Sequence, residues 1–432
     1  MNPTAARPNP YSKSLPGPQD ITRTQLSNGI ILLTRPNFNS PSVVVSGYLA
    51  CGSIFDPPEK LGLAQFTATS LTRGTAQHNF QEIFNSLESA GASLGFGASV
   101  HNTSFGGRAL SEDLPLLLGL LSECVRQPVF PKDQVERLRA QLLTSLAMRA
   151  QDTDEMSSMA FDAALFPDHP YGRPEDGFPE TIQAIQVGDL AEFHKAHFGP
   201  RGMVIVVVGA VSPQQALDAV ERALGDWRNS AQVESPAVPP GAAPKETFRK
   251  HIAIPGKSQT DLVMGTLGPQ RRSPDFLPAS LGNNILGQFG MMGRIGDVVR
   301  ERAGLAYHAS TSLNAWIGAG SWEVSAGVNP ANLQRAIDLI QRELERYVRR
   351  AVFKRELKDS QANFIGRLPL SLESNNGVAN ALLNLERFQL GLDYYQRYSD
   401  NVLAVTPEQI LAVSQKYIDP ERLIITSAGP EI

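Results

Sequence analysis

The sequence is poor in residues that mark a function by themselves. Its 432 residues include two cysteines, Cys51 and Cys124, too few for a disulfide framework and not spaced as zinc ligands. No stretch approaches the ~18 consecutive apolar residues of a membrane span. The net charge is −4 and no long run of Lys or Arg occurs, so nothing indicates nucleic-acid binding. Both cysteines are expected to be buried as small apolar side chains.

The composition is that of a soluble globular protein of two or more domains. Hydrophobic residues make up 42% of the chain and charged residues 19%. The N-terminal stretch is rich in Pro, Asn and Ser and lacks the apolar core of a secretory signal, so residues 1–21 are predicted to be a disordered lead-in. We expect a cytoplasmic location, or a periplasmic one if a signal peptide has been removed.

An internal repeat organises the rest of the chain. Phe193–Pro200 precedes the apolar run Met203–Val208, and Val413–Pro420 precedes the apolar run Leu423–Ala428. The proline and the glycine after the strand both recur at an offset of 220 residues. Two amphipathic helices recur at nearly the same offset, at residues 113–126 and 331–346. Two ordered matches at one offset indicate two homologous domains.

The boundary between the domains is predicted from composition. Residues 231–245 carry four prolines and little periodicity, as a linker does. The domains are therefore expected at 22–230 and 246–432.

Each domain is predicted to be α+β, with a mostly antiparallel sheet covered by helices on one face. In the first, Ser27-Asn28-Gly29 is a hairpin turn signal and Val43–Ala50 is a further strand. Helices are expected near 61–72 and 79–91, strands around 93–109, and helices from there to about 165.

The segment 62–75, Gly-Leu-Ala-Gln-Phe-Thr-Ala-Thr-Ser-Leu-Thr-Arg-Gly-Thr, has an unusual frame. It resembles the zinc-binding helix of the inverzincin metallopeptidases, in which Gly-Leu-Ala leads into His-x-x-Glu-His and Gly-Thr closes the segment. The three functional positions hold Gln65, Ala68 and Thr69. On a helix, positions 65 and 69 share one face, which is why ligands can converge there.

The resemblance extends to the third zinc ligand of that family, a Glu on a later helix. Counting back from Ala147-Met148-Arg149, this position is Thr144 or Ser145. Zinc needs imidazole, thiolate or carboxylate ligands, and the reaction needs a general base. None of these side chains supplies either, so the chain is expected to bind no metal or other cofactor and to be no enzyme on its own.

Other histidines give little indication of a metal site. His194 and His197 are three residues apart on a predicted helix, but no acidic or thiol partner is near in sequence. A solvated helix end is the favoured interpretation for this pair. His169 lies in a turn between prolines and is predicted to be structural.

The second half contains a glycine every third residue, followed by a recognisable signature. These glycines are Gly287, Gly290, Gly293 and Gly296. Their spacing is that of neither a dinucleotide fingerprint nor a P-loop, and by itself indicates a flexible loop entering a helix. Gly293–Tyr307 resembles the C-terminal signature of the same family, in which an Arg and a Tyr seven residues apart bind substrate near the zinc.

The corresponding residues are Arg300 and Tyr307, and Arg294 also matches the signature. Gly304 can end the helix that carries Arg300, and the next strand carries Tyr307, so both side chains can point to one place. Arg offers a rigid fork of donors, and the Tyr hydroxyl offers one more to a developing oxyanion. The structural alternatives are an ion pair of Arg300 with Asp297 and a half-buried strand position for Tyr307.

The resemblance covers the chain from about residue 22 and is to the pitrilysin, insulinase and mitochondrial processing peptidase family. It implies the inactive subunit of a heterodimeric zinc endopeptidase, with zinc and the His-x-x-Glu-His motif on the partner and unfolded or short peptides as substrates. The Gly287–Gly296 segment would guide the peptide. Three alternatives stay open: a scaffold protein, a stand-alone peptide-binding homodimer, and, least favoured, a zinc enzyme with unusual ligands.

Overall fold

The structure is a computed structural model and describes residues 15–290 and 292–432. Most of the predicted lead-in, 1–14, lies outside the described residues. The chain forms two compact units, each assembled from three segments. The first consists of the residues up to Leu143, with Glu175–Pro236 and Gly366–Asp400; the second of Thr144–Pro174, Ala237–Ile365 and Asn401–Ile432.

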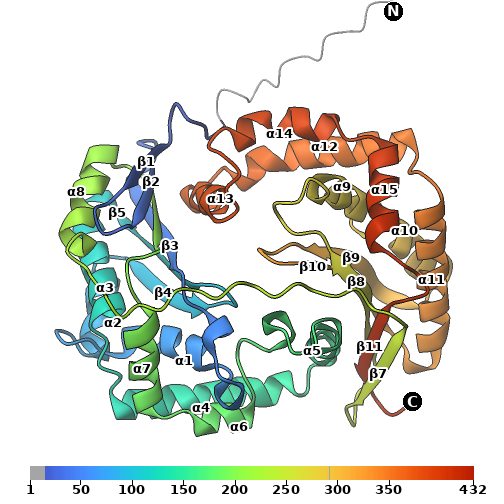
Figure 1. Cartoon of the computed structure of the whole chain (residues 1–432), viewed down its shortest axis with the longest axis horizontal. Coiled ribbons are helices and arrows are strands. Elements are labelled where there is room, and N and C mark those ends of the chain that lie inside the picture. Colours follow the sequence, from blue (N-terminus) through green and yellow to red (C-terminus); the bar gives the residue numbers. More distant parts are fainter. Residues whose placement is uncertain (1–14, 291) are drawn as a thin grey trace, which may run out of the picture. The chain divides into compact units, whose positions relative to one another are not determined.

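The first unit is built on a six-stranded sheet (Figure 1). Its strand order is β1-β2-β6-β3-β5-β4, and only the pair β2–β6 is parallel. The strands are β1 (Thr22–Gln25), β2 (Ile31–Pro36), β3 (Ser42–Leu49), β4 (Ser93–Ala98), β5 (Thr103–Leu110) and β6 (Val204–Gly209). The predicted hairpin joins β1 to β2, and Gly29 supplies the positive φ, 93°, that its turn requires.

Helices cover one face of this sheet and, over β3 and β6, the other face as well. They are α1 (Leu63–Ser70), α2 (Phe80–Ser89), α3 (Leu114–Arg126), the start of α4 (Lys132–Arg149), α6 (Pro179–Ala184), α7 (Val187–His197), α8 (Pro213–Leu224), α13 (Asn375–Arg387) and most of α14 (Tyr394–Leu403). Every residue of β6 is buried, and all but the first of β3, a pattern typical of strands covered on two sides. The prediction of one covered face is therefore wrong for β3 and β6, whereas β5 alternates buried and exposed residues over most of its length, as a strand covered on one face does.

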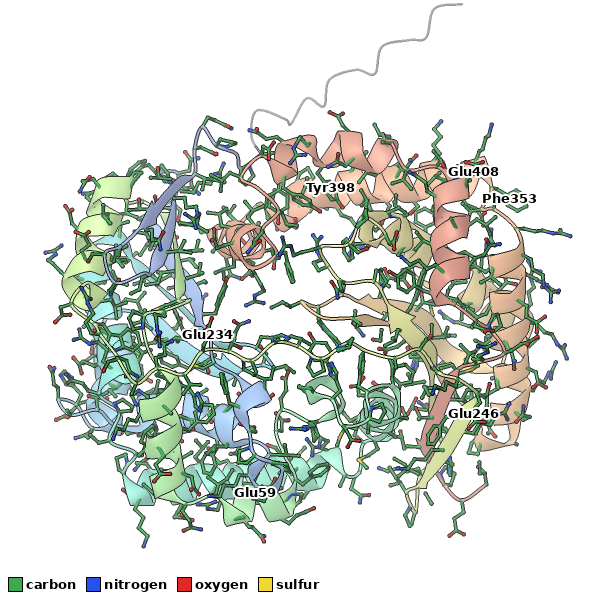
Figure 2. The ribbon with its side chains drawn as sticks, in the orientation of Figure 1. Glu59, Glu234, Glu246, Phe353, Tyr398 and Glu408 are labelled. Carbon is green, nitrogen blue, oxygen red and sulfur yellow. The ribbon has the colours of Figure 1, made fainter. Side chains whose placement is uncertain are left out.

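The second covering layer is α13. Val378, Leu382 and Leu385 of this helix form one buried cluster with β3 and β6 residues. The ring of Tyr398 on α14, labelled in Figure 2, packs against the same cluster.

The second unit repeats the topology of the first. Its sheet has the order β7-β11-β8-β10-β9, and only the pair β7–β11 is parallel. The strands are β7 (Phe248–Ala253), β8 (Thr260–Gly268), β9 (Ala306–Asn314), β10 (Gly320–Val328) and β11 (Ile424–Gly429). The helices are α5 (Thr153–Leu165), α9 (Phe276–Gly287), α10 (Gly293–Gly296), the π-helical turn η6 (Asp297–Arg302), α11 (Leu333–Arg349), most of α12 (Lys354–Ser371) and α15 (Pro407–Tyr417).

Strand by strand, the order β2-β6-β3-β5-β4 corresponds to β7-β11-β8-β10-β9, including the position of the parallel pair. The repeated α+β plan with mostly antiparallel sheets is therefore confirmed.

The compact units differ from two contiguous halves by an exchange of helices. Helix α5 comes from the first repeat but packs on β8 and β11. There the Thr426 hydroxyl donates to the carbonyl of Ser157 over 2.9 Å. Helix α13 comes from the second repeat but packs on β3 and β6. The boundaries 22–230 and 246–432 stay a prediction about the sequence repeat.

Two further features concern the surface. No helix in the described part of the chain has the length and apolarity to cross a membrane. Phe353, just before α12, is 74% exposed and stands among the labelled residues of Figure 2.

Candidate functional site

The three motif positions lie on α1, but their side chains serve the fold. Gln65 Oε1 accepts a 2.6 Å hydrogen bond from the backbone N–H of Ala98 on the edge strand β4. Ala68 is completely buried. The Thr69 hydroxyl donates to the carbonyl of Gln65, 2.8 Å away, within its own helix. The polar groups of this face are thus used inside the first unit.

These residues do not fit zinc. Neither Gln65 nor Thr69 offers a ligand that zinc prefers, and Ala68 offers no base. Thr144 and Ser145 are exposed on α4 and are not acidic. Within residues 15–290 and 292–432, no group of three His, Cys, Asp or Glu side chains lies close enough together to hold a metal ion.

The interpretation of His194 and His197 as a solvated helix end is wrong. His194 Nε2 lies 2.9 Å from the carbonyl of Val125, and burial lowers the pKa of its imidazole. The His197 ring lies 4.1 Å from the ring of Phe55, and burial lowers its pKa as well. His197 Nδ1 is buried without a hydrogen-bond partner in the described structure. Both rings are therefore packed inside the first unit.

His169 has the structural role that was predicted. It is 5% exposed, its Nδ1 accepts from the N–H of Tyr171 and its Nε2 lies 2.9 Å from the carbonyl of Pro239. The two cysteines are also buried and free, as predicted. Burial raises the pKa of both Cys51 and Cys124 to about 12.

Arg300 and Tyr307 come together in the second unit. Arg300 lies on η6, whose end is closed by Gly304 with a φ of 63°. The N–H of Gly304 donates to the carbonyl of Arg300, and that of Leu305 to the carbonyl of Val299. Tyr307 is the second residue of β9. The Arg300 guanidinium carbon is 5.9 Å from the centre of the Tyr307 ring, within the range of a cation–π contact.

Neither structural alternative for this pair holds. Asp297 pairs with Arg302 at 2.6 Å, whereas the ion pair of Arg300 is a loose one with the adjacent Glu301, at 3.6 Å. Tyr307 is 83% exposed and so is not half-buried. An exposed phenol and an arginine side chain beside it leave donors available for a ligand.

Arg294, in contrast, is part of the packing. Its guanidinium donates two hydrogen bonds to the carboxylate of Glu356, at 2.8 and 2.6 Å, and lies 5.6 Å from the centre of the Tyr347 ring. Its assignment to a substrate-guiding loop is therefore wrong. No sequence motif indicated Glu356 as its partner, because Glu356 lies 62 residues away.

The glycine segment is only partly a loop. A Cβ on Gly287, the last residue of α9, would lie 2.4 Å from the Thr311 hydroxyl. Gly293 has a φ of 63° and approaches the backbone of Gly287 too closely for any side chain. Gly296 is buried in α10. Gly290 alone has a positive φ with open space around its Cα, so the glycines mainly permit close packing of α9 and α10.

Comparison with known proteins agrees with this architecture. Residues 32–175 match the family "Insulinase (Peptidase family M16)" and residues 184–364 match "Peptidase M16 inactive domain". The chain belongs to the M16 (insulinase) peptidase family. The inverzincin resemblance of the sequence is thus confirmed.

Individual M16 relatives are distant but cover most of the chain. An uncharacterised zinc protease of Mycobacterium leprae is 26% identical over 409 residues, 92% of this chain and 89% of that protein. The crystal structure of a peptidase M16 inactive domain from Pseudomonas fluorescens is 26% identical, with a TM-score of 0.86, over 95% of this chain and 98% of that one. Subunit 1 of the human mitochondrial cytochrome b-c1 complex is 24% identical over 276 residues, 63% of this chain and 57% of that protein.

Proposed function

We propose that this M16 protein is the non-catalytic, substrate-binding subunit of a heterodimeric zinc metalloendopeptidase. The observation that carries the proposal is the contrast between its two sites. The motif helix holds Gln65, Ala68 and Thr69 in structural roles, whereas Arg300 and Tyr307 are held side by side with Tyr307 exposed. The zinc and the general base would belong to a homologous partner chain that carries His-x-x-Glu-His.

In this arrangement Arg300 and Tyr307 hold the substrate backbone or stabilise charge that develops on its carbonyl oxygen. The Arg300 fork suits a carbonyl or carboxylate, and the Tyr307 hydroxyl suits a developing oxyanion. A transition state gains from donors placed where charge develops, whichever chain supplies them. Unfolded or short peptides are the proposed substrates.

The first test is native mass spectrometry of the untagged protein purified from its own cells. The proposal requires a one-to-one complex with a similar-sized chain that carries His-x-x-Glu-His and one zinc ion. A homodimer or a monomer without zinc would contradict it.

The second test measures peptide turnover by that complex. Arg300→Ala should lower turnover by ~10²–10³-fold if it removes a donor to the transition state. Arg302→Ala is the matched control, because Arg302 lies on the same turn, its side chain is 71% exposed and it pairs with Asp297. Equal turnover of the two variants would remove the role assigned to Arg300.

A scaffold role is the second candidate, and the similarity to cytochrome b-c1 complex subunit 1 favours it. It predicts a stable assembly without proteolysis, unchanged by Arg300→Ala and Tyr307→Phe. The pairing of Arg300 with Tyr307 argues against it, because a pure scaffold has no need of both side chains.

A further inference from the structure

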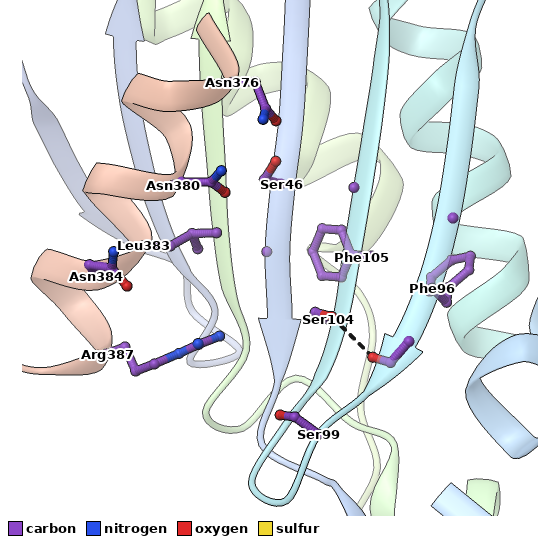
Figure 3. Close-up of a pocket in the computed structure, with 14 residues that line it drawn as sticks. Ser46, Phe96, Ser99, Ser104, Phe105, Asn376, Asn380, Leu383, Asn384 and Arg387 are labelled. Atoms are coloured by element: carbon purple, nitrogen blue, oxygen red, sulfur yellow. Dashed lines mark hydrogen bonds between the residues drawn. The ribbon is translucent and has the colours of Figure 1, made fainter. Parts of the chain in front are cut away.

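A groove in the first unit is lined by residues that no sequence motif indicated. It has a volume of about 770 Å³ and lies between α13 and the strands β3, β5 and β4 (Figure 3). Ligand sites typically measure ~300–1,000 Å³. None of the residues assigned above to zinc-motif or substrate-binding positions lines it.

The floor of the groove is mostly a strip of small residues, although Phe96 and Phe105 of the same strands also line the groove. Ser46, Gly106 and Gly95 lie side by side on three neighbouring strands, and in the next row Ser104 is paired with Gly97. A Cβ on Gly95 or Gly106 would meet no atom within 4 Å. The Ser104 hydroxyl donates to the carbonyl of Gly97, at 3.0 Å, as the dashed line in Figure 3 marks. The floor therefore leaves open space above the strand backbones.

The wall of the groove is a row of three asparagines on α13. Asn376, Asn380 and Asn384 are four residues apart, so they lie on one face of the helix. Figure 3 shows Asn376 and Asn380 directed toward β3. None of the three side chains makes a hydrogen bond within the described structure, although Asn375 next to them bonds to Asn37. Each free amide offers both a donor and an acceptor.

One end of the row carries a positive charge that has no carboxylate partner among the described residues. Arg387 lines the groove, and its guanidinium carbon lies 4.8 Å from the centre of the Tyr48 ring. Its Nε is buried without a hydrogen-bond partner among the described residues. The adjacent Glu386 pairs with Arg23 instead, at 2.9 Å. Burial lowers the pKa of Arg387 because no anion compensates for the lost hydration.

We propose that this groove binds an extended peptide segment of about five residues that ends in, or carries, a carboxylate. A helix advances ~6 Å in four residues and an extended chain ~6.6 Å in two, so the asparagines match alternate residues of an extended backbone. Their amides pair with its N–H and C=O groups whatever its side chains are. Arg387 binds the carboxylate, which is either a C-terminus or an acidic side chain.

This inference goes beyond the proposed function, because it needs neither a partner chain nor zinc. It also gives a candidate substrate subunit a second place to hold peptide, on the first unit, whereas Arg300 and Tyr307 belong to the second unit. Recognition of backbone and carboxylate alone would be tolerant of sequence.

The test is fluorescence anisotropy of the full-length chain with labelled eight-residue Ala/Ser peptides. One probe has a free C-terminal carboxylate, a second is amidated, a third is amidated with an internal Glu, and a fourth has alternate backbone nitrogens methylated. We expect the free acid to bind about tenfold more tightly than the plain amide, since a charged hydrogen bond is lost with the carboxylate. Tight binding of the Glu probe would identify an acidic side chain as the source, and its absence the C-terminus.

The variants distinguish the contribution of the asparagine row to binding from that of the Arg387 charge. Asn380→Ala/Asn384→Ala should weaken the acid and the amide alike, by about tenfold, because two hydrogen bonds are lost. Arg387→Gln should abolish the difference in affinity between the free-acid and the amidated peptide, while the affinity for the amidated peptide stays unchanged. Arg387→Lys should restore part of this difference. Asn401→Ala, an exposed asparagine of α14 outside the groove, is the control and should change nothing.

Several results would overturn the proposal. These are no binding by the wild-type chain, equal binding by wild type and the double asparagine variant, or equal binding of the methylated probe and its parent. If the double variant does not fold, the single variant Asn384→Ala and the methylated probe still show whether the asparagines bind the peptide backbone. Loss of binding in Arg300→Ala instead would move the site to Arg300, whereas loss of turnover there bears only on the proposed function.

Discussion

Helix α13 belongs by sequence to the second repeat but stabilises the first unit, and Leu382 tests this exchange. Leu382 is completely buried in the cluster that joins α13 to β3 and β6. Leu382→Ala removes three carbons, worth ~0.8 kcal/mol each in transfer, and leaves a cavity that costs more. We expect a loss of about 3–5 kcal/mol in the free energy of unfolding of the first unit.

Hydrogen exchange read by mass spectrometry locates the effect. A loss of ~3 kcal/mol corresponds to ~10²-fold faster exchange of amides that open with the destabilised part. In Leu382→Ala these should be amides of β3 and β6, about 170 to 340 positions earlier in the chain. Phe161→Ala is the reciprocal variant: Phe161 is 1% exposed on α5, and the variant should accelerate exchange in β8 and β11.

Leu370→Ala is the control, because Leu370 is 66% exposed and the same truncation there should cost less than ~1 kcal/mol. Faster exchange in β8 and β11 for Leu382→Ala, with β3 and β6 unchanged, would refute the exchanged packing.

Three smaller predictions follow from single contacts. Arg294→Met should lower the free energy of unfolding, measured with urea, by ~1–3 kcal/mol. This loss is smaller than for a fully buried ion pair, because Arg294 and Glu356 are both partly exposed. Burial alone would raise the pKa of Glu356, but the hydrogen bonds and charge of Arg294, together with the backbone N–H of Phe353, outweigh burial and lower it. The stabilisation is therefore present above pH ~4.3 and lost as pH falls further, and the variant should lose the part of it that Arg294 supplies. Burial lowers the pKa of His197, so stability should fall as pH drops below ~6.5; His197→Phe should reduce this slope in thermal melts between pH 7 and 5, and an unchanged slope would contradict it. Cys51 and Cys124 should not react with a thiol reagent at pH 8 in the native state and should both react after unfolding, because both thiols are buried; fast labelling of either in the native state would count against their burial.

Local elements were predictable because their signals are local. The Asn28-Gly29 turn, the capped helix after Asn79 and the apolar strand at 203–208 each follow from residues within a few positions of one another. The exchange of α5 and α13 was not predictable in this way. An amphipathic helix indicates that its apolar face is covered, but not which sheet covers it.

The same difference between local and distant contacts explains which parts of the site could be predicted. Arg300 and Tyr307 are seven residues apart, and the turn at Gly304 between them is a local feature, so their proximity was predictable. Arg294 was misassigned because its partner Glu356 lies far along the chain. The asparagine row on α13 was missed because polar residues at helical spacing are typical of a solvated face. Only the sheet beneath α13 distinguishes a groove from such a face.

Helix α1 shows why the fold persists without the zinc motif. A histidine at position 65 would give up the hydrogen bond that Gln65 makes to the edge strand at Ala98. A glutamate at position 68 would place a carboxylate where Ala68 has no contact with water, and a buried charge without a partner costs several kcal/mol. Thr69 satisfies its hydroxyl within the helix and needs nothing from outside. Each motif position is thus adapted to packing. The surroundings of α1 favour a structural helix over a metal-binding one, which is the physical argument behind the proposal that a partner chain holds the zinc.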